Sequence, residues 1–271
     1  MLPPFVTPTW LRDHRNEVVV ADVRWRLQGP SGREEYEREH IADAVFVDLD
    51  TQLADIGDPR DGRHPLPTPE AFAAAMASLG IGNTDQVVAY DDAGGLFAAR
   101  LVWMLRATGH AAALLDGGLA TWDGPLEAGA GHARAPAAFT PRPWPVAQIA
   151  SLDDVGNPSN VVIDVRARAR YRGDMEPVDP RAGHIPGAIN VPAEEHLSDG
   201  ALVPPATLRA QFAAAGITSA DGVIASCGSG VNACHSLLVM EHAELGTGRL
   251  FPGSFSAWSN RPELPVQTDA T

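Results

Sequence analysis

The sequence predicts an α/β protein built from two tandem copies of one domain. Four segments of the first half recur in the second half, in the same order and at nearly constant spacing. Chance similarity would not preserve both, so we interpret the chain as a duplication of a domain of about 125 residues. The matched segments are VVVADVRWR (18–26) with VVIDVRARA (161–169), EHIADAVFVD (39–48) with GHIPGAINVP (183–192), QVVAYDDAGGLFAARLVWML (86–105) with GVIASCGSGVNACHSLLVM (222–240), and LLDGGLATW (114–122) with LFPGSFSAW (250–258).

Within each copy, short apolar runs alternate with helical patterns. The run at 86–90 precedes a helical pattern at 96–109, whereas 68–80 begins with a Thr cap followed by Pro, and 207–216 is its counterpart. Apolar strands separated by helices predict a mainly parallel sheet with helices on both faces. Ligands of such sheets bind beyond the carboxyl ends of the strands.

The joint between the copies is recognisable by composition. The stretch before residue 147 is rich in Gly, Ala and Pro without periodicity, as linkers are. We therefore predict an N-terminal domain at 1–124, a linker at 125–146 and a C-terminal domain at 147–271.

Charge and composition exclude several functional classes. The net charge of −14 argues against a nucleic-acid partner. No apolar run approaches the roughly 20 residues that span a bilayer, and the first residues lack a signal-peptide pattern. Two cysteines are too few for a disulfide framework, so we expect a cytoplasmic protein without a membrane partner.

The strongest chemical signal is the loop that begins at Cys227. The apolar strand 223–226 delivers this cysteine to the sheet edge, and a helical pattern begins near Val231. Gly228 and Gly230 let successive N–H groups point inward as an anion-binding nest. The nest and the helix N-terminus favour the nucleophilic thiolate. A buried packing role is the alternative for Cys227.

This loop resembles that of a known enzyme family. The stretch CGSGVNAC (227–234) resembles the active-site loop of rhodanese-type sulfurtransferases, in particular the CGSGVT loop of 3-mercaptopyruvate sulfurtransferases. The stretches at 183–188 and 250–258 resemble the two other signatures of the family. The resemblance implies two tandem rhodanese-like domains, an active C-terminal copy and an inactive N-terminal copy, in which Asp91 and Asp92 stand where the cysteine would be.

The resemblance also implies a reaction. The Cys227 thiolate takes sulfur from a small anionic donor, becomes a persulfide, and passes the sulfur to cyanide or to a thiol such as a thioredoxin-like dithiol. No cofactor or metal is required. Because Gly228 and Ser229 replace the basic side chains of thiosulfate-preferring loops, we expect 3-mercaptopyruvate as the donor, with thiosulfate as the alternative.

Further site residues follow from the resemblance. Ser229, His64 and Asp50 match a Ser/His/Asp set that moves a proton. Arg170 matches an arginine that grips the donor's carboxylate or sulfonate, and the loop residues Gly228, Gly230, Val231 and Asn232 are expected to contact the substrate.

Three positions depart from the family pattern. Val178 stands where a second substrate-binding arginine is usual, and we name Arg181 as its candidate replacement. Asn232 replaces a threonine and is expected to cap the helix and bond the sulfur. Ala257 replaces a glutamate. These departures bear on which sulfur donor we expect more than on the type of reaction.

Several residues recur in both copies, including the copy without cysteine. They are Asp22 with Asp164, Arg24 with Arg166, and His40 with His184. Because they do not depend on the cysteine, we assign them to the architecture. Cys234 is similarly interpreted as a packing residue.

Three other functions compete. A phosphatase loop of the C-x5-R type would need arginine at 233, where this chain has Ala233. A non-enzymatic rhodanese-like module that binds partners or senses oxidants is a second alternative. The nine histidines lack the paired spacing of a zinc site, so we expect no metal.

Overall fold

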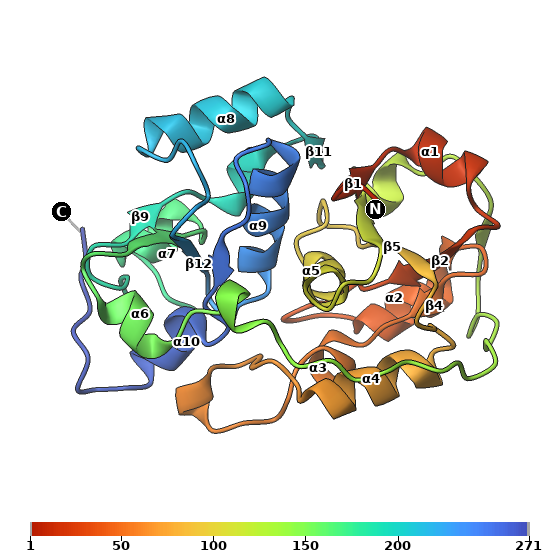
Figure 1. Cartoon of the computed structure of the whole chain (residues 1–271), viewed down its shortest axis with the longest axis horizontal. Coiled ribbons are helices and arrows are strands. Elements are labelled where there is room, and N and C mark those ends of the chain that lie inside the picture. The colour runs from red at the N-terminus through yellow and green to blue at the C-terminus, as the bar shows by residue number, and fades with distance from the viewer. Residues whose placement is uncertain (1, 270–271) are drawn as a thin grey trace. The chain divides into compact units, whose positions relative to one another are not determined.

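A computed structural model describes residues 2–269, and the chain forms two compact units (Figure 1). Unit 1 comprises Met1–Asp55, Pro67–Trp144 and Ser198–Leu202, and unit 2 comprises Ile56–Leu66, Pro145–Leu197 and Val203–Thr271. Residue 1 and residues 270–271 of the predicted domains lie outside the described part. The segment 56–66 comes from the first half of the sequence yet folds with unit 2.

Unit 1 contains a five-stranded sheet in which every neighbouring pair is parallel. Its order is β1-β6-β5-β2-β4, formed by Phe5–Val6, Ala112–Leu115, Gln86–Tyr90, Val18–Asp22 and Val45–Phe46. The strands are apolar on both faces, as parallel strands covered on both sides must be.

Unit 2 repeats this arrangement. Its parallel sheet has the order β13-β12-β8-β9, formed by Arg249–Leu250, Val223–Ser226, Val161–Asp164 and Ile189–Asn190. A single parallel bridge between Ile149 and Leu250 stands where β1 pairs with β6 in unit 1. The predicted fold class of two duplicated, mainly parallel α/β domains is confirmed.

Helices cover both faces of the unit 1 sheet. α1 and α2 contribute Leu11 and Tyr36 to one core, together with Val20 and Val88 of the sheet, whereas α5 contacts β5 and β6. α4 begins where predicted, because the Thr68 side chain caps it. The helices are α1 Pro8–Asp13, α2 Gly32–Arg38, α3 Leu49–Gln52, α4 Pro69–Ser78, α5 Ala99–Ala107 and the 3-10 turn η2 Gly118–Thr121; β3 His40–Ile41 pairs with β7 Leu126–Glu127.

Unit 2 has corresponding helices. α9 lies against β12 and β13, and α6 and α10 contribute Val155 and Phe255 to the core with Val162 and Ile224 (Figure 1). α8 begins at Pro205, two residues before the predicted start, since Pro occupies its first position. The remaining elements are η1 Pro59–Asp61, η3 Val146–Gln148, α6 Leu152–Gly156, α7 Arg168–Arg172, η4 Ala193–His196, α8 Pro205–Ala214, α9 Asn232–His242 and α10 Ser254–Ser259. The pair β10 Leu197–Ser198 and β11 Ala201–Leu202 lies mostly in the segment Ser198–Leu202, which groups with unit 1.

The residues repeated in both halves form equivalent buried pairs. Asp22 and Asp164 each end a strand and accept hydrogen bonds from the arginine two residues later, at 2.7 and 2.6 Å in the closest contacts. His40 and His184 each stack on a tyrosine ring, with ring centroids 3.7 Å apart. Removing one partner of a buried ion pair costs about 3–5 kcal/mol. These contacts fit the architectural role expected for them.

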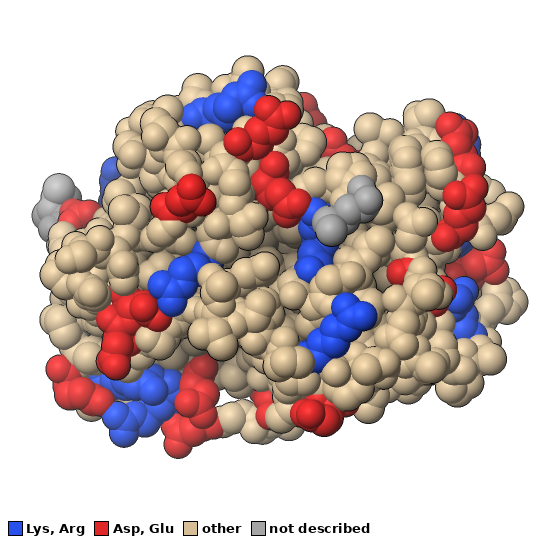
Figure 2. Space-filling view, in the orientation of Figure 1, with Lys and Arg blue, Asp and Glu red and all other residues tan. Residues whose placement is uncertain are grey.

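The described residues contain no helix that is long and apolar enough to cross a membrane. Acidic and basic side chains are interspersed on the face that Figure 2 displays.

Candidate active site

Cys227 directly follows β12 and begins a buried loop that leads into α9. Its sulfur accepts a hydrogen bond from the Gly230 N–H at 3.1 Å. The residue is 3 % exposed, so Cys227 is almost wholly buried. The loop therefore offers the sulfur one main-chain donor, and the Ser254 hydroxyl lies 4.0 Å from it.

The two glycines of the loop are required for different reasons. Gly230 has φ +79°, and a Cβ on it would lie 2.3 Å from the Pro252 carbonyl oxygen. Gly228 is limited by its surroundings, because a Cβ there would lie 2.9 Å from Nη2 of Arg63 and 3.4 Å from Nη1 of Arg170. Two guanidinium groups thus meet over the residue next to Cys227.

Unit 1 has a loop at the equivalent place with a carboxylate in it. Asp91 follows β5 as Cys227 follows β12, and it is fully buried. Its carboxylate accepts four main-chain N–H bonds of 2.8–2.9 Å, from Ala93, Gly95, Phe97 and Ala98. Burial raises the pKa of Asp91, and the four donors oppose that rise. The strand–loop–helix turn of this fold therefore holds an anion on main-chain amides.

Ser229 and His64 lie together in unit 2. Nδ1 of His64 is 2.8 Å from Oγ of Ser229, and the two residues are 9 % and 8 % exposed. A hydroxyl bonded to an imidazole forms a path for a proton. His64 belongs to the segment 56–66, which folds with unit 2.

Asp50, the third residue of the predicted set, lies in unit 1. It is exposed at the start of α3, where its carboxylate accepts a hydrogen bond from Nε1 of Trp25 at 2.9 Å. Its role in orienting His64 stays a prediction.

Arg170 lies in α7 and is held by two buried carboxylates. Its Nε and Nη2 donate to Glu176 at 3.2 and 2.6 Å, and Nη2 also donates to Asp179 at 3.1 Å. Burial tends to raise the pKa of Glu176, but Arg170 and nearby N–H groups lower it below its ordinary value. The remaining nitrogen, Nη1, is the atom of Arg170 that lies nearest to the Cβ position of Gly228, at 3.4 Å.

Arg63 was missed by the sequence analysis. Its Nη1 pairs with Oδ1 of Asp179, whose other oxygen accepts from Arg170, while its Nη2 lies over Gly228. The only local signal is its place directly before His64 in the sequence.

The structure gives Arg181 a different setting from the one expected. Its guanidinium donates to the main-chain carbonyls of Trp258, Ser259, Arg261 and Leu264, at 2.7–2.9 Å. Carbonyls at a helix C-terminus need such donors, and here two lie in the last turn of α10 and two follow it. Arg181 therefore stabilises the end of this helix, and we do not carry it into the proposed site.

Helix α9 begins at Asn232, the residue that was expected to cap it. Val231 occupies the cap position and Asn232 is the first helical residue, with no side-chain capping bond, so the expectation that Asn232 caps the helix is wrong. Cys234 is fully buried, and its thiol donates to the Gly230 carbonyl at 3.3 Å. That contact fits the packing role expected for it.

Ser254 is a second residue that the sequence analysis missed. It is fully buried and has φ +50°, although it is not glycine. Its Oγ accepts the N–H of Cys227 at 3.0 Å and donates to the Phe251 carbonyl at 3.0 Å. Non-glycine residues in this conformation are strained and concentrate at functional sites.

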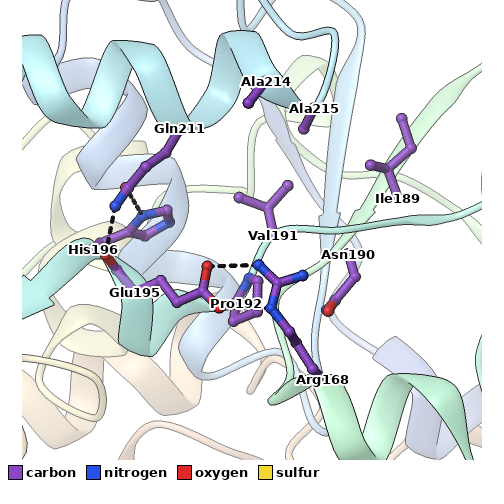
Figure 3. A pocket seen from close by; sticks show the side chains of 10 residues that line it. All are labelled: Arg168, Ile189, Asn190, Val191, Pro192, Glu195, His196, Gln211, Ala214 and Ala215. Atoms are coloured by element: carbon purple, nitrogen blue, oxygen red, sulfur yellow. Dashed lines mark hydrogen bonds and ion pairs between the residues drawn. The ribbon is translucent and has the colours of Figure 1, made fainter.

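Two further features lie away from the loop residues. Unit 2 contains a cavity of about 380 Å³ between η4 and α8, lined by residues that include Ile189, Val191 and His196, with Arg168 and Glu195 paired beside it (Figure 3). None of its lining residues belongs to the Cys227 loop. In unit 1, Asp43, Glu127 and His132 lie within reach of one metal ion, but Glu127 already accepts hydrogen bonds from His40 and the Asp43 N–H.

Comparisons with known proteins cover nearly all of the chain. The family description "Rhodanese-like domain" matches residues 7–124 and 148–261. A probable 3-mercaptopyruvate sulfurtransferase of Pseudomonas aeruginosa is 39% identical over 93% of both chains. A putative thiosulfate sulfurtransferase of Mycobacterium tuberculosis is 38% identical over 92% of this chain and 90% of its own. The crystal structure of the Escherichia coli 3-mercaptopyruvate enzyme superposes with a TM-score of 0.82, at 33% identity, over 93% of this chain and 99% of its own.

Proposed function

This chain belongs to the rhodanese-like family, and we propose that it is a sulfurtransferase that moves sulfur from 3-mercaptopyruvate through a Cys227 persulfide to a thiol or to cyanide. The family membership predicted from the loop is confirmed by the match in both halves. The observation that carries the assignment is the sulfur of Cys227, which accepts a main-chain N–H at the N-terminus of α9.

The first half-reaction forms an S–S bond. The Cys227 thiolate attacks the sulfur of 3-mercaptopyruvate, and the C–S bond breaks with its electron pair on carbon. The enolate of pyruvate leaves and takes up the proton of the donor's thiol. Pyruvate and an enzyme persulfide anion result, so atoms and charge balance without an external oxidant.

Ser229 and His64 support the proton transfer in this step. The donor's S–H proton must travel to the enolate, and the bonded hydroxyl and imidazole provide groups that accept and release it. The nest of the loop holds the terminal sulfur of the persulfide as it becomes anionic, as the Asp91 carboxylate is held in unit 1.

The second half-reaction returns the thiolate. An acceptor nucleophile attacks the terminal sulfur, the S–S bond breaks, and Cys227 leaves as thiolate. With cyanide the product is thiocyanate, and with a dithiol such as a thioredoxin-like protein the sulfur leaves on the acceptor. A cytoplasmic setting is supported by Cys227 and Cys234, neither of which forms a disulfide.

The donor is the finer part of the proposal. Arg170 beside Gly228 favours an anion, and a carboxylate or a sulfonate satisfies a guanidinium equally well. The relative from Mycobacterium tuberculosis keeps thiosulfate as the second candidate donor.

Intact mass spectrometry of the full chain tests the proposal. After incubation with 3-mercaptopyruvate, we expect the protein to gain one sulfur atom, Cys227→Ser to gain none, and Cys234→Ser to retain the gain. If Cys227 gained sulfur faster from thiosulfate than from 3-mercaptopyruvate, thiosulfate would be assigned as the donor. The absence of any gain on Cys227 with either donor would favour a binding or redox-sensing module instead.

A further inference from the structure

The cavity between η4 and α8 of unit 2 is built from residues that the Cys227 loop does not use. Its volume of about 380 Å³ is near the lower end of the roughly 300–1,000 Å³ that ligand pockets have, so it suits a small molecule. All ten lining residues belong to unit 2. The apolar part of the wall consists of Ile189, Val191 and Pro192, together with Ala214 and Ala215 at the C-terminal end of α8 (Figure 3).

One wall of the cavity is fixed by hydrogen bonds of the Gln211 amide. Nε2 of Gln211 donates to the Glu195 carbonyl at 2.7 Å, so its Oε1 accepts from Nδ1 of His196 at 3.1 Å. Burial lowers the pKa of His196, which Gln211 and Glu195 oppose, so the imidazole is neutral at pH 7 with its proton on Nδ1. The full charges among the lining residues therefore lie on Arg168 and Glu195.

These two charges form a pair that a ligand can reach. Nε and Nη2 of Arg168 donate to the two carboxylate oxygens of Glu195, each at 2.7 Å, and the side chains are 53 % and 43 % exposed. So exposed a pair contributes at most about 1 kcal/mol, and it does not keep its groups from another partner. Nη1 of Arg168 has no hydrogen-bond partner among the described residues, and each carboxylate oxygen accepts more than one bond.

Asn190 adds an acceptor to the wall. Its Nδ2 donates to the main-chain carbonyls of Asp164 and Arg166, both at 2.9 Å, so both hydrogens of the amide are used. Oδ1 is then left to accept a hydrogen bond from a ligand. The cavity thus offers a guanidinium to an anion, and a carboxylate and an amide oxygen to a cation, beside an apolar wall.

We propose that this cavity binds a free α-amino acid with an apolar side chain. Its carboxylate binds Arg168, its ammonium group binds Glu195 and Asn190, and its side chain packs on the apolar wall. In an α-amino acid both charges stand on one carbon atom, so they lie as close together as the two paired side chains do. A peptide terminus has only one of the two charges. The site goes beyond the proposed function, because no step of sulfur transfer uses it.

Equilibrium dialysis of the full chain with radiolabelled L-leucine tests the proposal. We expect saturable binding at one site per chain. Two competitors separate the charges: isoamylamine is leucine without its carboxylate, and 4-methylpentanoate is leucine without its ammonium group. Each should bind at least about tenfold more weakly than L-leucine, because each leaves one charged group of the cavity without its partner.

Four variants locate the site. Arg168→Gln should weaken L-leucine about tenfold but change isoamylamine less than about twofold, since that compound has no carboxylate to lose. Arg172→Gln is the matched control, because Arg172 lies in the same helix outside the cavity. Ala214→Phe should fill the cavity and abolish binding, whereas Ala213→Phe, at an exposed neighbouring position of α8 that does not line the cavity, should bind as the wild type does.

Several results would overturn the inference. They are the absence of saturable L-leucine binding at millimolar concentrations, equal affinities for the three compounds, and equal binding by Ala214→Phe and Ala213→Phe. Competition between L-leucine and 3-mercaptopyruvate for one site would also overturn it. Cys227→Ser should bind L-leucine as the wild type does, so a failure of the proposed sulfur transfer would leave this inference standing.

Discussion

Replacing Asp91 by asparagine tests whether the loop after a central strand is held together by an anion on main-chain amides. Each oxygen of Asp91 accepts two N–H bonds. In the asparagine variant one oxygen becomes an NH₂ group, so two buried N–H groups lose their acceptor. At about 1–3 kcal/mol for each unsatisfied donor, the free energy of unfolding of unit 1 should fall by about 4 kcal/mol. That is a large part of the stability of an ordinary domain.

Urea denaturation followed by tryptophan fluorescence measures this loss. Of the six tryptophans, all but Trp258 lie in unit 1, so the signal reports mainly that unit. The control is Asp92→Asn, because the partly exposed Asp92 pairs with Arg26 and should contribute at most about 1 kcal/mol. If Asp91→Asn lowers the free energy of unfolding no more than Asp92→Asn does, main-chain amides do not stabilise an anion in the unit 1 loop. The same interpretation of the Cys227 loop then loses its support.

Three further predictions concern unit 2. Ser254→Ala and Ser254→Gly both remove the acceptor of the Cys227 N–H, but only alanine keeps a strained backbone at the positive φ. In urea titrations Ser254→Ala should therefore be less stable than Ser254→Gly by about 1 kcal/mol, and equal stability would argue against strain at this residue. Ser229→Ala should lower kcat for pyruvate release about a hundredfold and change KM less, whereas an unchanged kcat would remove its hydroxyl from the proton path. The Ser151 N–H and Arg249 lower the pKa of Asp154 to about 2, whereas its pKa in the unfolded chain is about 3.9. The carboxylate therefore stabilises the fold fully above about pH 3.9 and loses this effect as the pH falls through about 2. Asp154→Asn should therefore have a lower urea midpoint than wild type at pH 7, and the difference should vanish near pH 2; a constant difference would contradict the assignment.

The sequence was most informative where the determinants are local. The strand that ends before Cys227 was predicted from an uninterrupted apolar run, and the strand occupies the same residues. The start of α4 was predicted from a cap and a proline that act within one turn. The duplication helped because it presents each local pattern twice.

The residues that were missed depend on contacts between distant parts of the chain. Arg63 meets Asp179 across more than a hundred residues, and no periodicity or cap encodes such a pair. Arg181 was expected at the substrate because of its place in the sequence, but its guanidinium donates to carbonyls in the last turn of α10. The conformation of Ser254 is set by the buried N–H of Cys227, which likewise lies far away in sequence.

The folding of the stretch 56–66 with unit 2 makes the proposed site depend on a piece of the first half of the sequence. A polypeptide cut at the duplication joint would keep the nucleophile and Arg170 but would lose Arg63 and His64 at once. Such a fragment would lack His64, one end of the proposed proton path. On the proposed mechanism, the half without the loop cysteine therefore supplies a residue that the other half needs for turnover.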